Sequence, residues 1–192
     1  MLMKKITALL IALTAMVCMS CDEDTEIAYR LEGEWDGDMG MYYVYESADR
    51  YGPYSMEYDA QYTNIRFVRT TLTSGYGDQV DFYNRGPYEW RSFSFRWSVR
   101  NGNIYMDYDY ADELDCVIYD YYIDRNHLGG MIGNTHIVLD KLRDFTWDGY
   151  IDYNDGYDYN YYYDYAKTRS AGAAADSVKA GRVVKSGSRF SE

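Results

Sequence analysis

The sequence predicts an all-β protein, built as an antiparallel meander of short strands. Its 192 residues include 25 Tyr, 4 Trp and 6 Phe, and aromatic side chains favour strands over helices. The chain also contains 16 Gly and only 2 Pro, which suits tight turns between short strands. Residues 27–153 show no long helical period, so we expect about seven or eight strands in this stretch.

The clearest strand signal lies in residues 91–100, where apolar residues alternate with serine and arginine. This alternation turns one face of the strand toward a core. Asn101-Gly102 follows, a dipeptide preferred in two-residue hairpin turns, and a second strand is expected over residues 103–108. The turn sets a register that pairs Val99 with Ile104, Trp97 with Met106, Phe95 with Tyr108 and Phe93 with Tyr110 on the apolar face, and Arg96 with Asp107 and Ser94 with Asp109 on the polar face.

Further strands are predicted by similar patterns on both sides of this hairpin. They cover residues 32–45, 62–71, 78–83, 114–123 and 135–142. Turn signals at 84–87, 124–127 and 129–130 separate them. A meander of this size must protect its edge strands, and closure into a small barrel does this most completely. A two-sheet β-sandwich is the alternative.

The first 21 residues contain, in order, the cationic region, the apolar region and the small residue at the cleavage site that form a secretory signal. Lys4 and Lys5 precede an apolar run over residues 6–17, and the small residue Ser20 stands directly before Cys21. The apolar run is too short for a permanent membrane-spanning helix. The segment resembles a bacterial lipoprotein signal, which implies cleavage after residue 20 and acylation of Cys21.

One position departs from that signal, because Cys18 stands where leucine is usual. An ordinary secreted protein is the alternative, but it would leave Cys21 as a free thiol in an oxidising compartment. The acidic run at 22–26 resembles the signal by which Bacteroidota lipoproteins reach the outer face of the outer membrane, and its alternative is a solvated linker. We therefore expect a lipid-anchored outer-membrane protein exposed at the cell surface, with an acidic tether over residues 21–30.

Charge narrows the classes of partner. The formal net charge is −12, which argues against nucleic acid and against anionic lipid surfaces as partners. Residues 154–192 are rich in tyrosine at first and then become basic, with few aromatic residues after Lys167. Such a composition cannot bury enough surface to order itself, so we expect a disordered tail after a barrel domain over residues 31–153.

The sequence offers little for catalysis or metal binding, and we expect a protein that is not an enzyme and carries no metal or cofactor. His127 and His136 lack the helical spacing of a zinc site. Cys116 is expected to be a small buried apolar residue. Acidic and asparagine side chains crowd residues 148–158, where calcium binding is one hypothesis, but their spacing does not fit an EF-hand loop and a solvated loop is the alternative.

Gly33-Glu34-Trp35 opens the first predicted strand of the mature chain and resembles the Gly-x-Trp signature of lipocalins. Tyr119-Asp120-Tyr121 is similar to the Thr-Asp-Tyr turn of that family, although the threonine is missing. Over residues 31–142 the chain resembles small lipocalin-like (calycin-type) surface lipoproteins of Bacteroidota. The resemblance implies a lipid-anchored barrel in which Gly33 and Trp35 are structural and Trp35 packs under an arginine, for which Arg143 is a candidate.

Two functional hypotheses follow. In the first, the barrel is a non-catalytic binding module for a small apolar or glycan ligand, with a lumen lined by Phe93, Phe95, Trp97, Met106 and Tyr108. In a small barrel these side chains can instead simply fill the lumen. In the second, the chain is an accessory outer-membrane lipoprotein that binds a protein partner through its tyrosine-rich acidic outer surface.

Overall fold

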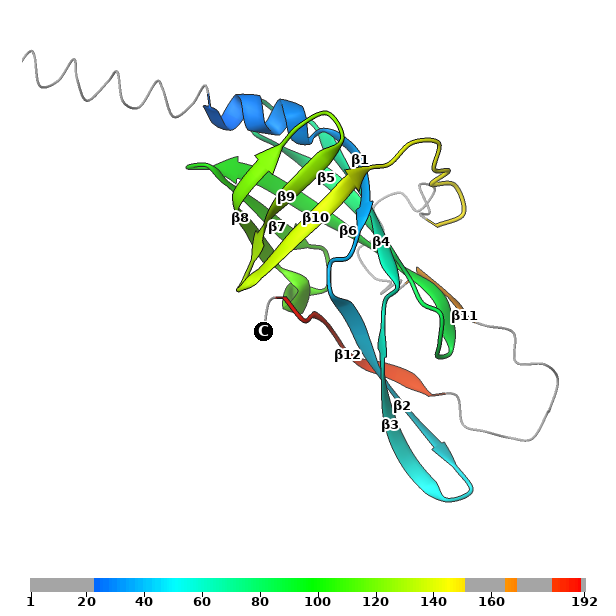
Figure 1. Ribbon diagram of the computed structural model, residues 1–192. Helices are drawn as coiled ribbons and strands as arrows, with labels where there is room; N and C mark the ends of the chain where they lie inside the picture. The colour runs from blue at the N-terminus through cyan, green and yellow to red at the C-terminus, as the bar shows by residue number, and fades with distance from the viewer. Residues whose placement is uncertain (1–22, 151–164, 169–180, 191–192) are drawn as a thin grey trace, which may run out of the picture.

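The computed structural model describes residues 23–150, 165–168 and 181–190 (Figure 1). Eight strands form a barrel: β1 (Gly33–Gly37), β4 (Tyr62–Arg69), β5 (Ser74–Phe82), β6 (Tyr88–Arg100), β7 (Asn103–Tyr108), β8 (Cys116–Ile123), β9 (His127–Ile132) and β10 (Thr135–Lys141). Neighbouring strands pair antiparallel in the order β6-β5-β4-β1-β10-β9-β8-β7, and β7 pairs back to β6. The predicted closure of the meander into a small barrel is confirmed, and the sandwich alternative is wrong.

The predicted hairpin register is confirmed where the ladder runs. β6 and β7 pair Phe95 with Tyr108, Trp97 with Met106 and Val99 with Ile104. The ladder ends at Tyr108, and Tyr110 is 76% exposed with a positive φ of 60°, so it does not pair with Phe93. Arg96 stands opposite Asp107 as expected, while its guanidinium forms a long ion pair of 3.9 Å with Asp109.

Between β1 and β4, which are neighbours in the barrel, the chain leaves the barrel and contributes two strands to a second sheet of three. This sheet consists of β12 (Arg182–Ser188), β2 (Met41–Asp49) and β3 (Gly52–Asp59). We call the hairpin formed by β2 and β3 the arm, because it extends away from the barrel (Figure 1). β11 (Tyr165–Thr168) pairs with the first part of the long strand β6, beyond the part of β6 that pairs with β7.

The single strand predicted over residues 32–45 is wrong in one respect, because the chain bends between β1 and β2. Gly40 has a φ of +64°, a conformation that glycine adopts at little cost. Its backbone N–H donates to the Asp38 carboxylate at 2.7 Å. This local turn sends β2 out of the barrel and into the second sheet.

Two strands within residues 31–153 were not predicted, β3 and β9. β3 contains Pro53, which argues against a central strand, and β3 is indeed an edge strand of its sheet. β9 contains Gly129 and Gly130, which we interpreted as a turn. A Cβ at Gly129 would overlap the Tyr122 ring, and a Cβ at Gly130 would come within 2.6 Å of Ile118. These glycines therefore let side chains of β8 cross closely over β9.

The acidic tether predicted over residues 21–30 is corrected by an α-helix over residues 23–31. Ala28 and Leu31 are fully buried against the barrel, which a freely solvated linker would not allow. The helix lies across the end of the barrel that carries the turns at 70–73, 101–102 and 124–126 (Figure 1). We call this the capped end, and the opposite one the far end.

The disordered tail predicted over residues 154–192 is wrong for two described segments. β11 lies on β6, and β12 pairs with β2 along most of its length. Ser186 and Ser188 are buried, and Phe190 packs on the main core. A long-range pairing orders this segment, and local composition does not reveal such a pairing. Residues 151–164 and 169–180, with most of the calcium hypothesis, lie outside the described residues, as does the export signal.

Candidate functional site

The five residues predicted to line the lumen come from β6 and β7. The structure brings Phe95, Trp97, Met106 and Tyr108 together in the main core, where their exposed fractions are 0%, 2%, 0% and 4%. Phe93 is half-buried and packs at the edge of this core. The rings of Phe67 and Phe95 meet edge to face at 5.4 Å, and those of Phe67 and Trp97 at 5.9 Å. The middle of the lumen is therefore filled by side chains.

Trp35 closes the lumen beneath the capped end. Its side chain is fully buried, and its Nε1–H donates to the Leu31 carbonyl of the N-terminal helix at 2.9 Å. The Lys141 ammonium lies 4.0 Å from the centre of the Trp35 ring and donates to the Glu32 carbonyl at 3.0 Å. Burial lowers the pKa of this lysine, while nearby Glu34 and Glu32 oppose the shift.

Gly33 makes room for that contact. Its φ is +131°, and a Cβ there would overlap the Lys141 ammonium. The cation over Trp35 is thus a lysine, whereas Arg143, the candidate from the resemblance, places its guanidinium 3.5 Å from the Asn126 side chain. Tyr119-Asp120-Tyr121 lies within β8, at a register shift between Tyr119 and Tyr122 where Asp120 has a φ of 48°. Gly33 and Trp35 thus take part in packing at the capped end, where Gly33 leaves room for Lys141 over the Trp35 ring.

A polar cluster that the sequence did not predict occupies the far end of the lumen. Asp81 is fully buried, and its Oδ1 accepts hydrogen bonds from Thr63 at 2.7 Å and from the Gln79 amide at 2.9 Å. The Tyr108 hydroxyl donates to Gln79 Oε1 at 2.5 Å. Asp81 Oδ2 is buried and accepts no hydrogen bond of standard geometry among the described residues. The fold therefore buries the Asp81 carboxylate in this cluster, away from solvent.

Burial dominates the electrostatics of Asp81. Desolvation raises the pKa of its carboxyl to about 7, although the hydrogen bonds from Thr63 and Gln79 and the nearby Arg91 and Tyr83 favour the ionised form. Arg91 stands opposite Asp81 in the β5–β6 ladder and is itself buried. Its guanidinium donates to the Ser186 hydroxyl of β12 at 2.6 Å. The cluster therefore links the barrel to the second sheet.

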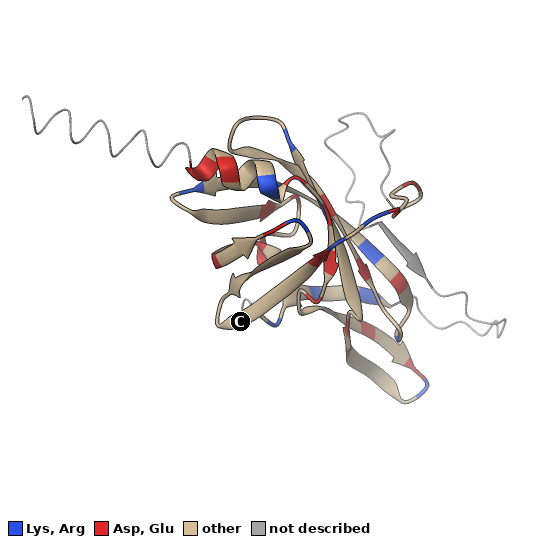
Figure 2. Ribbon diagram, turned by 45° about the horizontal axis from the view of Figure 1, so that its top comes forward, with Lys and Arg blue, Asp and Glu red and all other residues tan. Residues whose placement is uncertain are grey.

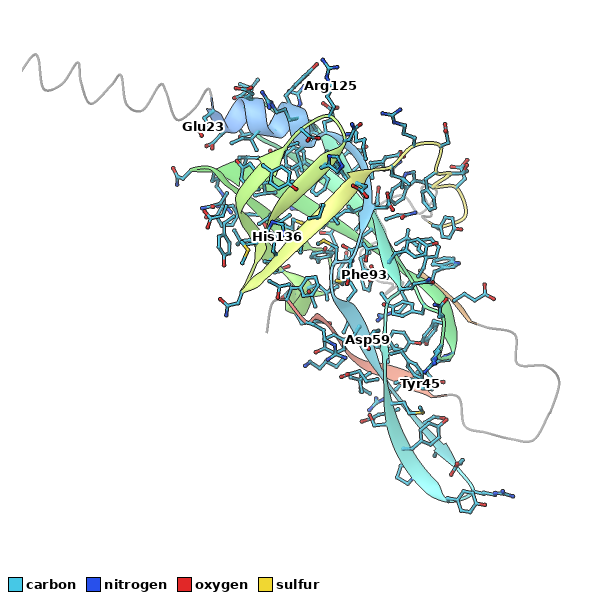
Figure 3. All side chains as sticks on the ribbon, viewed as in Figure 1. Glu23, Tyr45, Asp59, Phe93, Arg125 and His136 are labelled. Carbon is cyan, nitrogen blue, oxygen red and sulfur yellow. The ribbon has the colours of Figure 1, made fainter. Side chains whose placement is uncertain are left out.

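The arm carries the most exposed apolar surface near the far end. Its side chains Tyr51, Tyr54 and Met56 are 82%, 39% and 49% exposed. At its root the Tyr43 ring is buried and contacts the rings of Tyr58, Tyr83 and Tyr88, with centres 5.3, 4.7 and 5.5 Å away. These contacts fix the arm on the barrel. In Figure 3 the labelled Tyr45 and Asp59 lie on this second sheet, and Phe93 lies near its junction with the barrel.

An open cavity of about 440 Å³ lies toward the tip of the arm. Ala48, Pro53, Tyr54 and Arg182 are among its lining residues. It is open to solvent over much of its extent, so it is a surface depression and not an enclosed ligand pocket. The sequence did not reveal this cavity, because β12 lies near the C-terminus, more than a hundred residues after β2.

The residues considered for catalysis or metal binding lie apart. His127 contacts Asp124 at 3.3 Å and Asp140 at 3.5 Å on the surface, while His136 lies on β10. Burial raises the pKa of the Cys116 thiol to about 12, and its sulfur lies 3.9 Å from that of Met106. Across residues 23–150, 165–168 and 181–190, no group of three or more His, Cys, Asp or Glu side chains is placed to hold a metal ion.

The comparisons with known proteins add no family assignment. No model of a known protein family matches the chain, and neither a curated protein nor a solved structure matches it. In the part of the chain that the structure describes, none of the helices has the length and apolar character needed to cross a membrane.

Proposed function

We propose that this chain is a lipid-anchored lipoprotein of a bacterial outer membrane that binds a protein partner through its arm and has no catalytic activity of its own. The lipid anchor is supported by the sequence before Cys21, in which two lysines, an apolar run and a small residue follow one another. One observation carries the choice of binding surface. Tyr51, Tyr54 and Met56 of the arm are exposed by 39–82%, whereas the predicted lumen residues of β6 and β7, apart from Phe93, are exposed by at most 4%.

The geometry of the arm suits protein recognition. Tyrosine and methionine are enriched in protein interfaces, where a ring or thioether supplies apolar area at low entropic cost. The aromatic contacts around Tyr43 hold the arm in one position, so less freedom is lost on binding. β3 is an edge strand whose Pro53 and Glu57 discourage open-ended strand pairing. Binding through the side-chain face is therefore favoured over simple addition of a strand.

Site-specific cross-linking on intact cells tests this proposal. A photoreactive phenylalanine derivative at Tyr54 should give one defined cross-linked species. The matched control is the same group at Tyr122, which has a similar exposure of 49% but lies on the barrel wall. The species should disappear when Met56→Asp is added. Equal cross-linking from both positions, or none from Tyr54, would refute binding through the arm.

The anchor and its address have separate tests. Mass spectrometry of the N-terminal peptide should find acyl chains on Cys21, and Cys21→Ser should release the protein from membranes. Proteinase added to intact cells should digest the protein if it faces outward. Complete survival of the protein under that treatment would contradict exposure at the surface, whatever the state of Cys21.

A small apolar or glycan ligand in the lumen is the second candidate function, and the polar cluster favours it. A ligand with a hydrogen-bond donor could pair with Asp81 Oδ2, near which the Tyr83 hydroxyl also lies. Native mass spectrometry of protein isolated from its producing cells should then show a bound mass that is lost on unfolding and lost in Asp81→Asn. A bare mass in the unaltered protein would count against this candidate.

A further inference from the structure

We propose that the capped end of the barrel lies against the lipid bilayer, so that the arm points away from the membrane. This inference rests on the proposed anchor at Cys21. It specifies which end of the barrel contacts the bilayer, and it specifies that the arm faces away from the membrane.

The first argument is the shortness of the connection. Cys21 stands two residues before Glu23, the first described residue of the N-terminal helix. Two residues span at most about 7 Å between Cα atoms even when fully extended. A lipid on Cys21 would therefore hold the start of this helix next to the headgroup layer, and the chain has no long flexible tether at this point.

The second argument is that the helix is fixed to the barrel. The Asp24 carboxylate accepts hydrogen bonds from the backbone N–H groups of Asn101 at 3.1 Å and Gly102 at 2.8 Å. Further along the helix, the Arg30 guanidinium donates to the Ile123 carbonyl at 3.4 Å. Contacts at both of its ends, together with the buried Ala28 and Leu31, make the helix and barrel one body. The whole capped end is thus carried to the bilayer.

The third argument is the chemistry of that surface. The chain is strongly acidic, yet two glutamates at this end are paired with arginines: Glu26 with Arg30 at 2.5 Å and Glu32 with Arg69 at 3.2 Å. Figure 2 shows the first part of the helix mostly red and a blue segment, which carries Arg30, near its end. Glu23 and Asp124 remain exposed and acidic at this end, so the surface suits zwitterionic headgroups and not anionic ones. The capped end is therefore compatible with a lipid surface.

Exposed apolar side chains complete the surface. Leu72 is 66% exposed in the turn at 70–73, whose other residues are threonines, and Tyr29 is 68% exposed on the helix. The Arg69 guanidinium lies 5.6 Å from the centre of the Tyr29 ring. Aromatic rings, leucines and arginines with apolar stems are side chains that lie well at the membrane interface. These residues would sit at the headgroup level.

The arm extends from the other side of the molecule. Glu23 and Arg125 mark the capped end in Figure 3, while Tyr45 and Asp59 lie toward the opposite end. The tip of the hairpin formed by β2 and β3 is far from the N-terminal helix in Figure 1, and Tyr51 lies in the turn between these two strands. An anchor at the capped end therefore presents the arm to partners outside the membrane.

Tryptophan quenching on vesicles tests this orientation. The lipidated protein with Leu72→Trp, Tyr29→Trp or Tyr51→Trp is reconstituted into phosphatidylcholine vesicles that carry a nitroxide on the headgroup. The unaltered protein supplies the background of the four native tryptophans. We expect loss of the added emission for Leu72→Trp and Tyr29→Trp, and none for Tyr51→Trp at the arm tip. Equal quenching at the three positions, or none at Leu72→Trp and Tyr29→Trp, would overturn the proposed orientation.

The same experiment separates this inference from the anchor itself. Protein recovered without acyl chains on Cys21 would refute the anchor. The tryptophan variants would then be coupled through the Cys21 thiol to a maleimide phospholipid, and the same quenching pattern would decide the orientation. Because Cys116 is half-buried, these variants also carry Cys116→Ala, which keeps the maleimide on Cys21.

Discussion

Asp81 provides the sharpest test of how the far end of the barrel is built. Its carboxyl is buried, and its pKa is raised from 3.8 to about 7. A carboxyl whose folded-state pKa is raised contributes stability that is fully present below the unfolded pKa and is lost as the pH rises through the folded pKa. The protein should therefore lose stability from this group between about pH 4 and pH 7.

The size of the loss follows from the shift. A difference of about three pKa units corresponds to roughly 4 kcal/mol, at about 1.4 kcal/mol per unit. Asp81→Asn removes the titration and keeps an oxygen that accepts from Thr63 and Gln79. The variant should therefore lose less stability with rising pH than the unaltered protein, by a few kcal/mol (about 2–4) between pH 4 and pH 8.

Urea unfolding at pH 4, 6 and 8 measures this difference. Asp107→Asn is the matched control, because it removes one carboxylate from an exposed position on β7. Asp36 and Asp109, whose pKa values are also raised by burial, are present in all three proteins and cancel in the comparison. The same pH dependence in Asp81→Asn and the unaltered protein would refute the argument that burial holds a proton on Asp81.

Three further predictions concern packing. Trp97→Ala should lower the free energy of unfolding by about 3–5 kcal/mol, because a filled lumen loses a large side chain; urea unfolding checks this, and a loss below 1 kcal/mol would indicate an open lumen. Gly33→Ala should destabilise by about 1–3 kcal/mol, since φ is +131° and Lys141 must move; an unchanged temperature of thermal unfolding would contradict this. Asp24→Ala should cost about 1–3 kcal/mol and speed amide hydrogen exchange at Asn101 and Gly102; unchanged exchange there would show that the helix is held by other contacts.

The sequence determined the hairpin and the class of fold. The alternation around Trp97 and the turn at Asn101-Gly102 specify both strands and their register from residues that are neighbours along the chain. A meander of such strands has unpaired edges, and closing the barrel removes them. The sequence also indicated that Phe95, Trp97, Met106 and Tyr108 share one face, and the structure places them in one core. Their role in binding remains a prediction.

The tertiary structure decided everything that depends on partners distant in sequence. β12 is ordered by pairing with β2, more than a hundred residues earlier in the chain, so its own composition gave no sign of a strand. Gly129 and Gly130 resemble a turn until Tyr122 and Ile118 of β8 are seen to pack against them. Residues 23–31 form a helix because Ala28 and Leu31 become buried against the end of the barrel.

The polar cluster is another feature that the tertiary structure decided and the sequence did not. Thr63, Gln79, Asp81 and Tyr108 are ordinary strand residues in the sequence, and alternation says only which face each takes. Barrel closure brings β4, β5 and β7 together at one end and excludes water there, which raises the pKa of Asp81. Local patterns thus specify strands and turns, because those depend on adjacent residues. Burial and desolvation depend on which strands meet, and only the folded chain determines that.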